Sequence, residues 1–142
     1  MNSDVPSAAM MVPVVKVARF METLQGDVLD DVFVDEGLVI VENFAPHIFS
    51  GPTARRDWQQ GFGVHARGLS ELVHSFGPAQ DFSWTGDLAY FSLPTRWGGK
   101  VDGRDFAEEG GWAFVLGGES GIWRIKSYVW AVTCFELSSP DV

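Results

Sequence analysis

Glu42 and His47 are the two side chains whose types and spacing suit proton transfer. Glu42 follows an apolar run at residues 38–41, and His47 lies five residues further along the chain. A carboxyl group in apolar surroundings has a raised pKa and can take a proton from a carbon beside a carbonyl group. Histidine titrates near neutral pH and can relay that proton. The same residues also fit a solvated strand end followed by a surface loop, so both interpretations stay open.

The other polar groups give weaker signals of a site. His65 and His74 are far apart in the sequence, and no paired-histidine or cysteine cluster accompanies them, so we predict no metal ion and no other cofactor. The acidic pairs at residues 35–36 and 108–109 are expected to be solvated strand ends or turns. The glycine pairs at 98–99 and 117–118 are interpreted as loop or bulge glycines, since no helix and lysine of a phosphate cradle follow them. Cys134, the single cysteine, is expected to be a buried structural thiol.

Composition excludes several classes of partner. The chain has 142 residues, a net charge of −9 and only 10 lysines and arginines, too few cations for binding nucleic acid or an anionic membrane. The N-terminus lacks the charged region of a signal peptide, and no apolar run is long enough to span a membrane. We therefore expect a soluble cytoplasmic protein with no nucleic-acid or membrane partner.

Helices are predicted first along the chain, followed by strands. Residues 1–12 are expected to form a flexible tail, and residues 13–142 a single domain. Pro13 suits the first turn of a helix that ends near Gly26, and Pro52 starts a second helix that ends in the sixties. Residues 88–101, 104–116 and 122–134 read as long strands, with a loop at 117–121.

The Asp102–Gly103 pair predicts a type I′ hairpin turn, and this turn places Leu93 opposite Trp112. The order of helices first and strands afterwards predicts an α+β fold, in which the N-terminal helices pack on one face of a strongly curved, mostly antiparallel sheet. With 11 phenylalanines and 6 tryptophans, the side chains on that face are expected to wall an apolar pocket.

Four segments carry a resemblance to a known family. They are Gln25-Gly26-Asp27, residues 33–42, Phe49-Ser50-Gly51, and residues 85–90 together with 121–125. Over residues 13–134 the chain resembles the NTF2-like superfamily, specifically its SnoaL-like domains. The resemblance implies a cone with a pocket at one end and a homodimer formed through the outer face of the sheet. The family includes isomerases, cyclases, dehydratases and proteins without catalytic activity, so the fold alone does not give the function.

The resemblance also suggests site residues. Glu42 matches the acid that shuttles the proton in ketosteroid-isomerase-like members, which makes it a candidate general base. The tyrosine of those isomerases falls at Arg19 or Phe20, and their second acid falls near Trp112. This chain has no tyrosine at the first position and no acidic residue at the second, which disfavours the isomerase mechanism itself. The side chains expected to bind a ligand are Phe20, Trp58, Leu93, Trp112, Tyr128 and Trp130.

Three functions follow from these observations. The first, which the sequence favours, is binding of a small hydrophobic or planar molecule in the pocket. The second is a cofactor-independent lyase, cyclase or isomerase that uses Glu42, with His47 as a second group. The third is a non-catalytic dimerisation or association module. A buried Glu42 with a raised pKa would favour the second function, and a filled cavity would favour the third.

Overall fold

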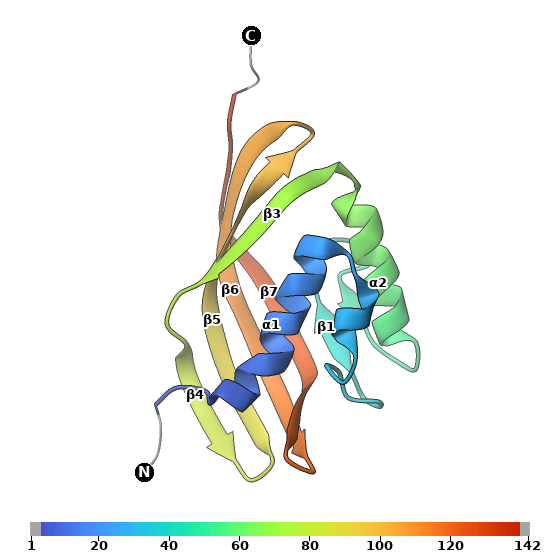
Figure 1. Ribbon diagram of the computed structural model, residues 1–142, viewed down its shortest axis with the longest axis vertical. Helices are drawn as coiled ribbons and strands as arrows, with labels where there is room; N and C mark the ends of the chain where they lie inside the picture. Colours follow the sequence, from blue (N-terminus) through green and yellow to red (C-terminus); the bar gives the residue numbers. More distant parts are fainter. Residues whose placement is uncertain (1–3, 140–142) are drawn as a thin grey trace.

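The structure is a computed structural model that describes residues 4–139. It contains two α-helices, α1 (Ala8–Thr23) and α2 (Ala54–His65), and two short 3₁₀ helices, η1 (Gly26–Leu29) and η2 (Ala66–Gly68). Its strands are β1 (Val39–Val41), β2 (Ile48–Phe49), β3 (Leu69–Phe76), β4 (Gln80–Thr85), β5 (Leu88–Val101), β6 (Arg104–Glu119) and β7 (Ile122–Leu137). The strands form one sheet in the order β2-β1-β7-β6-β5-β3, with β4 paired to β5, and both α-helices lie on the same side of this curved sheet (Figure 1).

Helix α1 begins earlier than the sequence suggested. The Ser7 hydroxyl accepts a hydrogen bond from the Met10 N–H at 3.2 Å and caps the helix, so the first turn forms at Ala8 rather than at Pro13. Pro13 is buried inside the helix. The prediction of a tail over residues 1–12 is therefore wrong from Ala8 onward, while residues 1–3 of that range lie outside the described residues.

The long hairpin of β5 and β6 forms as predicted. Asp102 and Gly103 have φ angles of 49° and 81°, which is the type I′ geometry expected from their sequence. The register pairs Leu93 with Trp112, again as predicted. The predicted loop at residues 117–121 is wrong, because β6 continues through both glycines and the turn falls at Ser120 and Gly121. The ring of Trp123 packs close to the backbone of Gly118, in the space that a side chain at this position would need.

Strand β1 gives the sheet its mixed character and positions Glu42. It runs parallel to β7 and antiparallel to the short β2, which the sequence analysis did not predict. Ile40 is fully buried and Glu42 lies on the same face, because side chains alternate along a strand.

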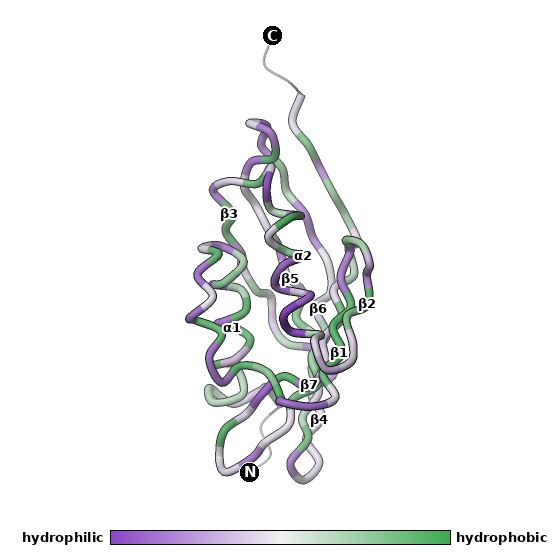
Figure 2. Tube along the Cα trace, turned by 90° about the vertical axis from the view of Figure 1, so that its right-hand side faces the viewer, coloured by the Kyte–Doolittle hydropathy of each residue, from purple (hydrophilic) through white to green (hydrophobic). Residues whose placement is uncertain are grey.

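Figure 2 shows the hydrophilic colouring of α2, whose exposed side carries Arg55 and Arg56.

The C-terminal end of β7 extends beyond the helices (Figure 1), and residues 131–139 are all exposed. Cys134 lies in this stretch and is exposed, so the prediction of a buried thiol is wrong. The apolar side chains of Val132 and Phe135 are exposed there too. Hydrophobicity alone therefore does not predict burial at this end of β7.

Gly110 is expected to tolerate no side chain. It follows a register shift between β6 and β7, and an added Cβ would collide with the Ala131 carbonyl oxygen and the Trp130 ring. We predict that Gly110→Ala lowers the free energy of unfolding by about 2 kcal/mol, because two paired strands would have to separate. Gly63→Ala is the matched control, since a Cβ at this helical position meets nothing within 4 Å and should stabilise by roughly 0.5–1 kcal/mol. Urea unfolding curves measure both, and equal midpoints for the two variants would contradict the assignment.

Candidate functional site

A cavity of about 210 Å³ opens between the helices and the sheet. Its walls are mostly rings, contributed by Phe44, Phe62, Trp97, Phe106, Trp112 and Trp130. Four polar side chains also line it, namely Glu42, Asn43, His65 and Glu108. An apolar cavity with a few polar groups is typical of a site for a small molecule.

Glu42 is the most deeply buried of these polar groups. Its side chain is 5% exposed. The indole Nε1–H of Trp58 donates to Oε2 at 2.9 Å, and the Tyr128 hydroxyl donates to the same oxygen at 2.6 Å. Oε1 has no hydrogen-bond partner among the residues that the structure describes. The carboxyl group is therefore held by one oxygen and presents the other to the cavity.

The pKa of Glu42 is raised from 4.5 to about 7, chiefly by burial and to a smaller extent by the nearby charge of Glu108. The hydrogen bonds from Tyr128 and Trp58 act in the opposite direction, because they stabilise the ionised form. Near neutral pH the group is present both as an acid and as a carboxylate. Since both donors hold Oε2 as an acceptor, the proton of the neutral form belongs on Oε1.

The two donors to Glu42 are fixed by the aromatic core behind it. Trp58 is fully buried and packs against Phe20 and Phe33, with ring centroids 5.4 Å away in each case. Burial and the neighbouring Glu42 raise the pKa of Tyr128 well above its usual range, so the phenol remains a donor. Because neither side chain has room to turn, the Glu42 carboxyl group keeps one orientation.

A second carboxylate, Glu108, also lines the cavity. It is half-buried, and burial raises its pKa, while an interaction with the Trp130 indole lowers it. Its Oε1 accepts a long hydrogen bond of 3.5 Å from the Asn43 amide. The prediction that residues 108–109 form a solvated pair is wrong for Glu108, because strand alternation turns it inward while Glu109 faces solvent.

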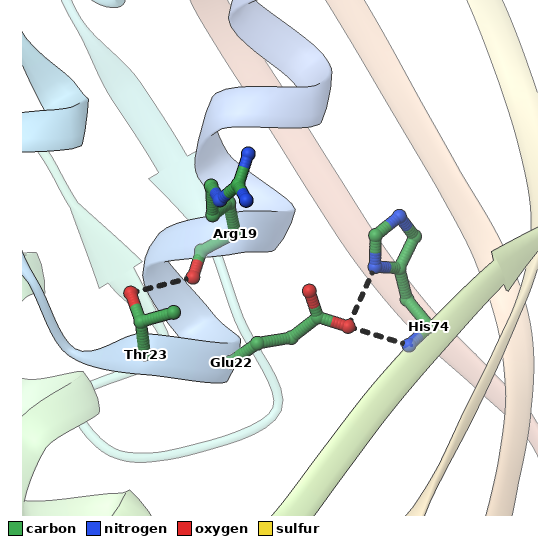
Figure 3. Close-up of polar contacts among 4 residues, drawn as sticks. All are labelled: Arg19, Glu22, Thr23 and His74. Atoms are coloured by element: carbon green, nitrogen blue, oxygen red, sulfur yellow. Dashed lines mark hydrogen bonds and ion pairs between the residues drawn. The ribbon is translucent and has the colours of Figure 1, made fainter.

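Glu22 and His74 form a pair that the sequence analysis missed (Figure 3). Glu22 Oε2 accepts from the His74 backbone N–H at 2.9 Å and lies 2.9 Å from the ring Nδ1. The ring packs against Trp97, which lines the cavity, at a centroid distance of 5.5 Å. His74 Nε2 has no hydrogen-bond partner within the described part of the chain. The only sequence signal was the alternation of Leu72, His74 and Phe76, which puts all three on the inner face of β3.

Comparison by sequence gives no significant match to a family model or to a curated protein. By structure, a type 2 hexachlorocyclohexane dehydrochlorinase (LinA) matches with a TM-score of 0.79 at 12% identity, over 93% of this chain and 88% of that chain. An NTF2-like superfamily protein from Salmonella enterica matches with a TM-score of 0.70 at 10% identity, over 86% and 87% of the two chains. The chain has the NTF2-like fold. A protein provisionally described as a ketosteroid isomerase, from Shewanella frigidimarina, shares this NTF2-like fold with a TM-score of 0.69 at 16% identity, over 88% and 96%.

The NTF2-like fold confirms the cone architecture predicted from the sequence, and identities this low show the fold alone. Within this fold, Trp112 and Trp130 line the cavity as expected. The other predicted ligand-binding side chains are buried and lie outside the cavity lining; these are Phe20, Trp58, Leu93 and Tyr128. Two of the four, Trp58 and Tyr128, contact Glu42 directly.

The structure does not bring His47 to the Glu42 carboxyl group. His47 is exposed in a tight turn with a φ angle of 73°, and its ring Nδ1 lies 3.0 Å from the Glu42 backbone oxygen. Its own backbone carbonyl accepts from the Glu42 N–H at 2.8 Å. His47 therefore lies against the end of β1 and is absent from the cavity lining.

Neither a metal site nor a membrane span is found in the described residues. Within residues 4–139, no three His, Cys, Asp or Glu side chains are grouped so that they could hold a metal ion. None of the helices in that range is both long and apolar enough to cross a bilayer.

Proposed function

We propose that this protein is a cofactor-independent lyase or isomerase that moves a proton on a small, mostly apolar molecule bound in the cavity. One observation carries the proposal: the Glu42 carboxyl group lies in the wall of an aromatic cavity, with a pKa of about 7 and one oxygen free. A proton-transfer group works best when its pKa is near the working pH.

The ionised Oε1 of Glu42 would take a proton from a carbon beside a carbonyl or another electron-withdrawing group. The electron pair of the broken C–H bond becomes a new π bond. In an elimination, a leaving group on the next carbon departs with its own bonding pair. In an isomerisation, the π pair of the adjacent carbonyl group moves onto its oxygen and gives a conjugated enolate. Glu42 then returns the proton to a different carbon of that enolate, and the oxygen pair forms the carbonyl group again. The aromatic walls exclude water, which strengthens the electrostatic interactions at the reacting atoms.

The Glu22–His74 pair supports the same class of reaction. An elimination with a poor leaving group, such as a hydroxyl group, needs a second group that protonates the leaving atom, and a histidine oriented by a carboxylate is suited to that role. Lining residues flank the pair, because Met21 precedes Glu22 in the chain and Trp97 packs on the His74 ring. The names of the similar structures agree with this class, since a dehydrochlorinase removes HCl and an isomerase moves a double bond.

The geometry favours this proposal over the two other functions. The cavity is open rather than filled, which disfavours a purely associating module that uses only its outer surface. A protein that merely binds a hydrophobic molecule has no need for a buried carboxyl group, whose ionisation is costly in apolar surroundings. Binding of a small apolar ligand remains part of the proposal, as does a homodimer through the outer sheet face.

Proton exchange in heavy water tests the proposal without knowledge of the natural substrate. Small ketones such as 4-phenylbutan-2-one are incubated with the protein, and deuterium uptake beside the carbonyl is followed by NMR. We expect the wild type to accelerate exchange and Glu42→Gln to be slower by about 100-fold or more, because a positioned acid–base group contributes roughly that factor. The surface variant Glu109→Gln is the matched control and should exchange at the wild-type rate.

Two outcomes would refute the role of Glu42. The first is exchange no faster than in buffer across a panel of aryl and cyclic ketones. The second is equal exchange by the wild type and Glu42→Gln. If His74→Gln abolishes exchange while Glu42→Gln does not, the base is His74 and the proposed role of Glu42 is wrong.

A further inference from the structure

Among the described residues Glu108 has no cationic partner, unlike the two neighbouring acids of β6, Glu109 and Asp105. Its neighbour Glu109 points outward and pairs with Arg96 at 2.9 Å, and Asp105 pairs with Lys100 at 3.1 Å. Glu108 points into the cavity, where its polar contacts are the Asn43 amide at 3.5 Å and the Trp130 indole. A carboxylate that is turned away from water is normally paired with a cation or strongly hydrogen-bonded.

The cavity contains two carboxyl groups and no compensating positive charge. Neither lysine nor arginine occurs among its described lining residues. His65 is the remaining basic group there, and burial lowers its pKa, which favours its neutral form. The charge of Glu108 raises the pKa of Glu42, so the two groups repel each other when both are ionised. A cation placed between them would remove that repulsion.

The walls of the cavity suit a cation of a particular kind. The indoles of Trp97, Trp112 and Trp130 line it, and Trp112 packs against both others with centroids 5.9 and 6.1 Å away. The faces of such rings attract ammonium groups that carry apolar substituents. A hydrated metal ion gains little from these walls, whereas an organic ammonium ion contacts both the rings and a carboxylate.

Trp112 provides an independent indication of a ligand. Its side chain is 1% exposed, and its Nε1–H finds no hydrogen-bond acceptor among the described residues. A buried donor without an acceptor is costly and rare. This indole lines the cavity, but its Nε1 atom is itself buried, so an oxygen atom of a bound molecule would satisfy it only after a small shift of the side chain.

We propose that the molecule bound here is a small apolar amine, held in its protonated form, that also carries an oxygen able to accept a hydrogen bond. Glu108 binds the ammonium group beside the Trp130 ring, and the Trp112 N–H donates to the oxygen. This inference rests on the proposed function, because it names the substrate class of the same cavity. It makes Glu108 a specificity-determining residue.

Three probes with the same phenylpropyl skeleton and different charges test whether the cavity selects a cation. Binding of 3-phenylpropylamine, 3-phenylpropan-1-ol and 3-phenylpropanoate is measured by calorimetry at about pH 8, where the amine is still protonated. We expect the amine to bind about ten-fold more tightly than the alcohol, and the carboxylate more weakly than either. Glu108→Gln should remove the preference for the amine over the alcohol. Glu109→Gln, the adjacent outward-facing control, should keep the preference.

The oxygen contact is tested with 3-amino-1-phenylpropan-1-ol. We expect this amino alcohol to bind the wild type several-fold more tightly than 3-phenylpropylamine, and Trp112→Phe to abolish that difference.

Equal affinities of the wild type for the amine and the alcohol would overturn the proposal, as would a preference that survives Glu108→Gln or the absence of binding by all the probes. If neutral ketones still exchange deuterium through Glu42 in that case, the proposed function stands and only the substrate class is wrong. If the amine preference holds and no exchange occurs, the substrate class stands and proton transfer is wrong.

Discussion

Glu42→Gln is expected to make the protein more stable at neutral and alkaline pH and to leave its stability almost unchanged in acid. The pKa of Glu42 is about 7 in the folded chain, compared with an ordinary value of 4.5. Between these values the folded state binds more protons than the unfolded state, so wild-type stability falls as the pH rises. The variant has no proton to lose. Above pH 7 its advantage should reach about 3 kcal/mol, at 1.36 kcal/mol for each pH unit of the shift.

Urea unfolding of both proteins from about pH 4 to pH 8 measures this difference. Glutamine keeps an amide oxygen that can accept from Trp58 and Tyr128, so the hydrogen bonds at Oε2 have a substitute. Glu109→Gln serves as the control for removal of a carboxylate, since Glu109 is about half exposed and pairs with Arg96. A difference between the wild type and Glu42→Gln that stays constant across this pH range would contradict the raised pKa.

Trp58→Ala is expected to cost about 3–5 kcal/mol of unfolding free energy, the range observed when a large buried aromatic side chain is truncated. Trp58 is fully buried, its ring contacts Phe20, Phe33 and Tyr128, and its N–H donates to Glu42. The loss therefore combines an apolar cavity with a missing donor. Trp84→Ala provides the comparison, because Trp84 is 60% exposed and its loss should cost less than about 1 kcal/mol.

Trp58→Phe separates the two contributions. It keeps an aromatic ring in the core and leaves a smaller cavity than alanine does, while it removes the indole N–H, a group that lowers the pKa of Glu42. We expect the midpoint of the pH-dependent stability to move above its wild-type position in this variant, with a smaller loss of stability than in Trp58→Ala. An unchanged midpoint would show that the hydrogen bond contributes nothing to the ionisation of Glu42.

Local patterns predicted much of the fold. The Asp102–Gly103 turn determined the pairing of the strands predicted at 88–101 and 104–116, because a two-residue type I′ turn leaves one register. The start of α1 was misplaced because Pro13 was taken to mark the first turn, whereas the helix is capped by Ser7 and Pro13 lies inside it.

The candidate site was predictable only in part, since it depends on contacts between distant segments. The sequence left open whether Glu42 faces the pocket or solvent, because its two donors come from distant elements, α2 and β7. Trp58 and Tyr128 were singled out as ligand-binding residues, whereas they lie behind the carboxyl group and orient it. The Glu22–His74 contact joins residues 52 positions apart in the sequence, and no local sequence pattern predicts a contact between residues so far apart. Glu108 was assigned to solvent because two adjacent acids resemble a surface pair.

The way Glu42 is anchored also bears on stereochemistry. A carboxyl group whose Oε2 is held by Trp58 and Tyr128 does not rotate, so its other oxygen meets a flat molecule in the cavity from a single side. Removal or delivery of a proton by that oxygen would then distinguish the two faces of a trigonal carbon. Any product with a new stereocentre at that carbon would be formed as one enantiomer, although the walls of the cavity are almost entirely apolar.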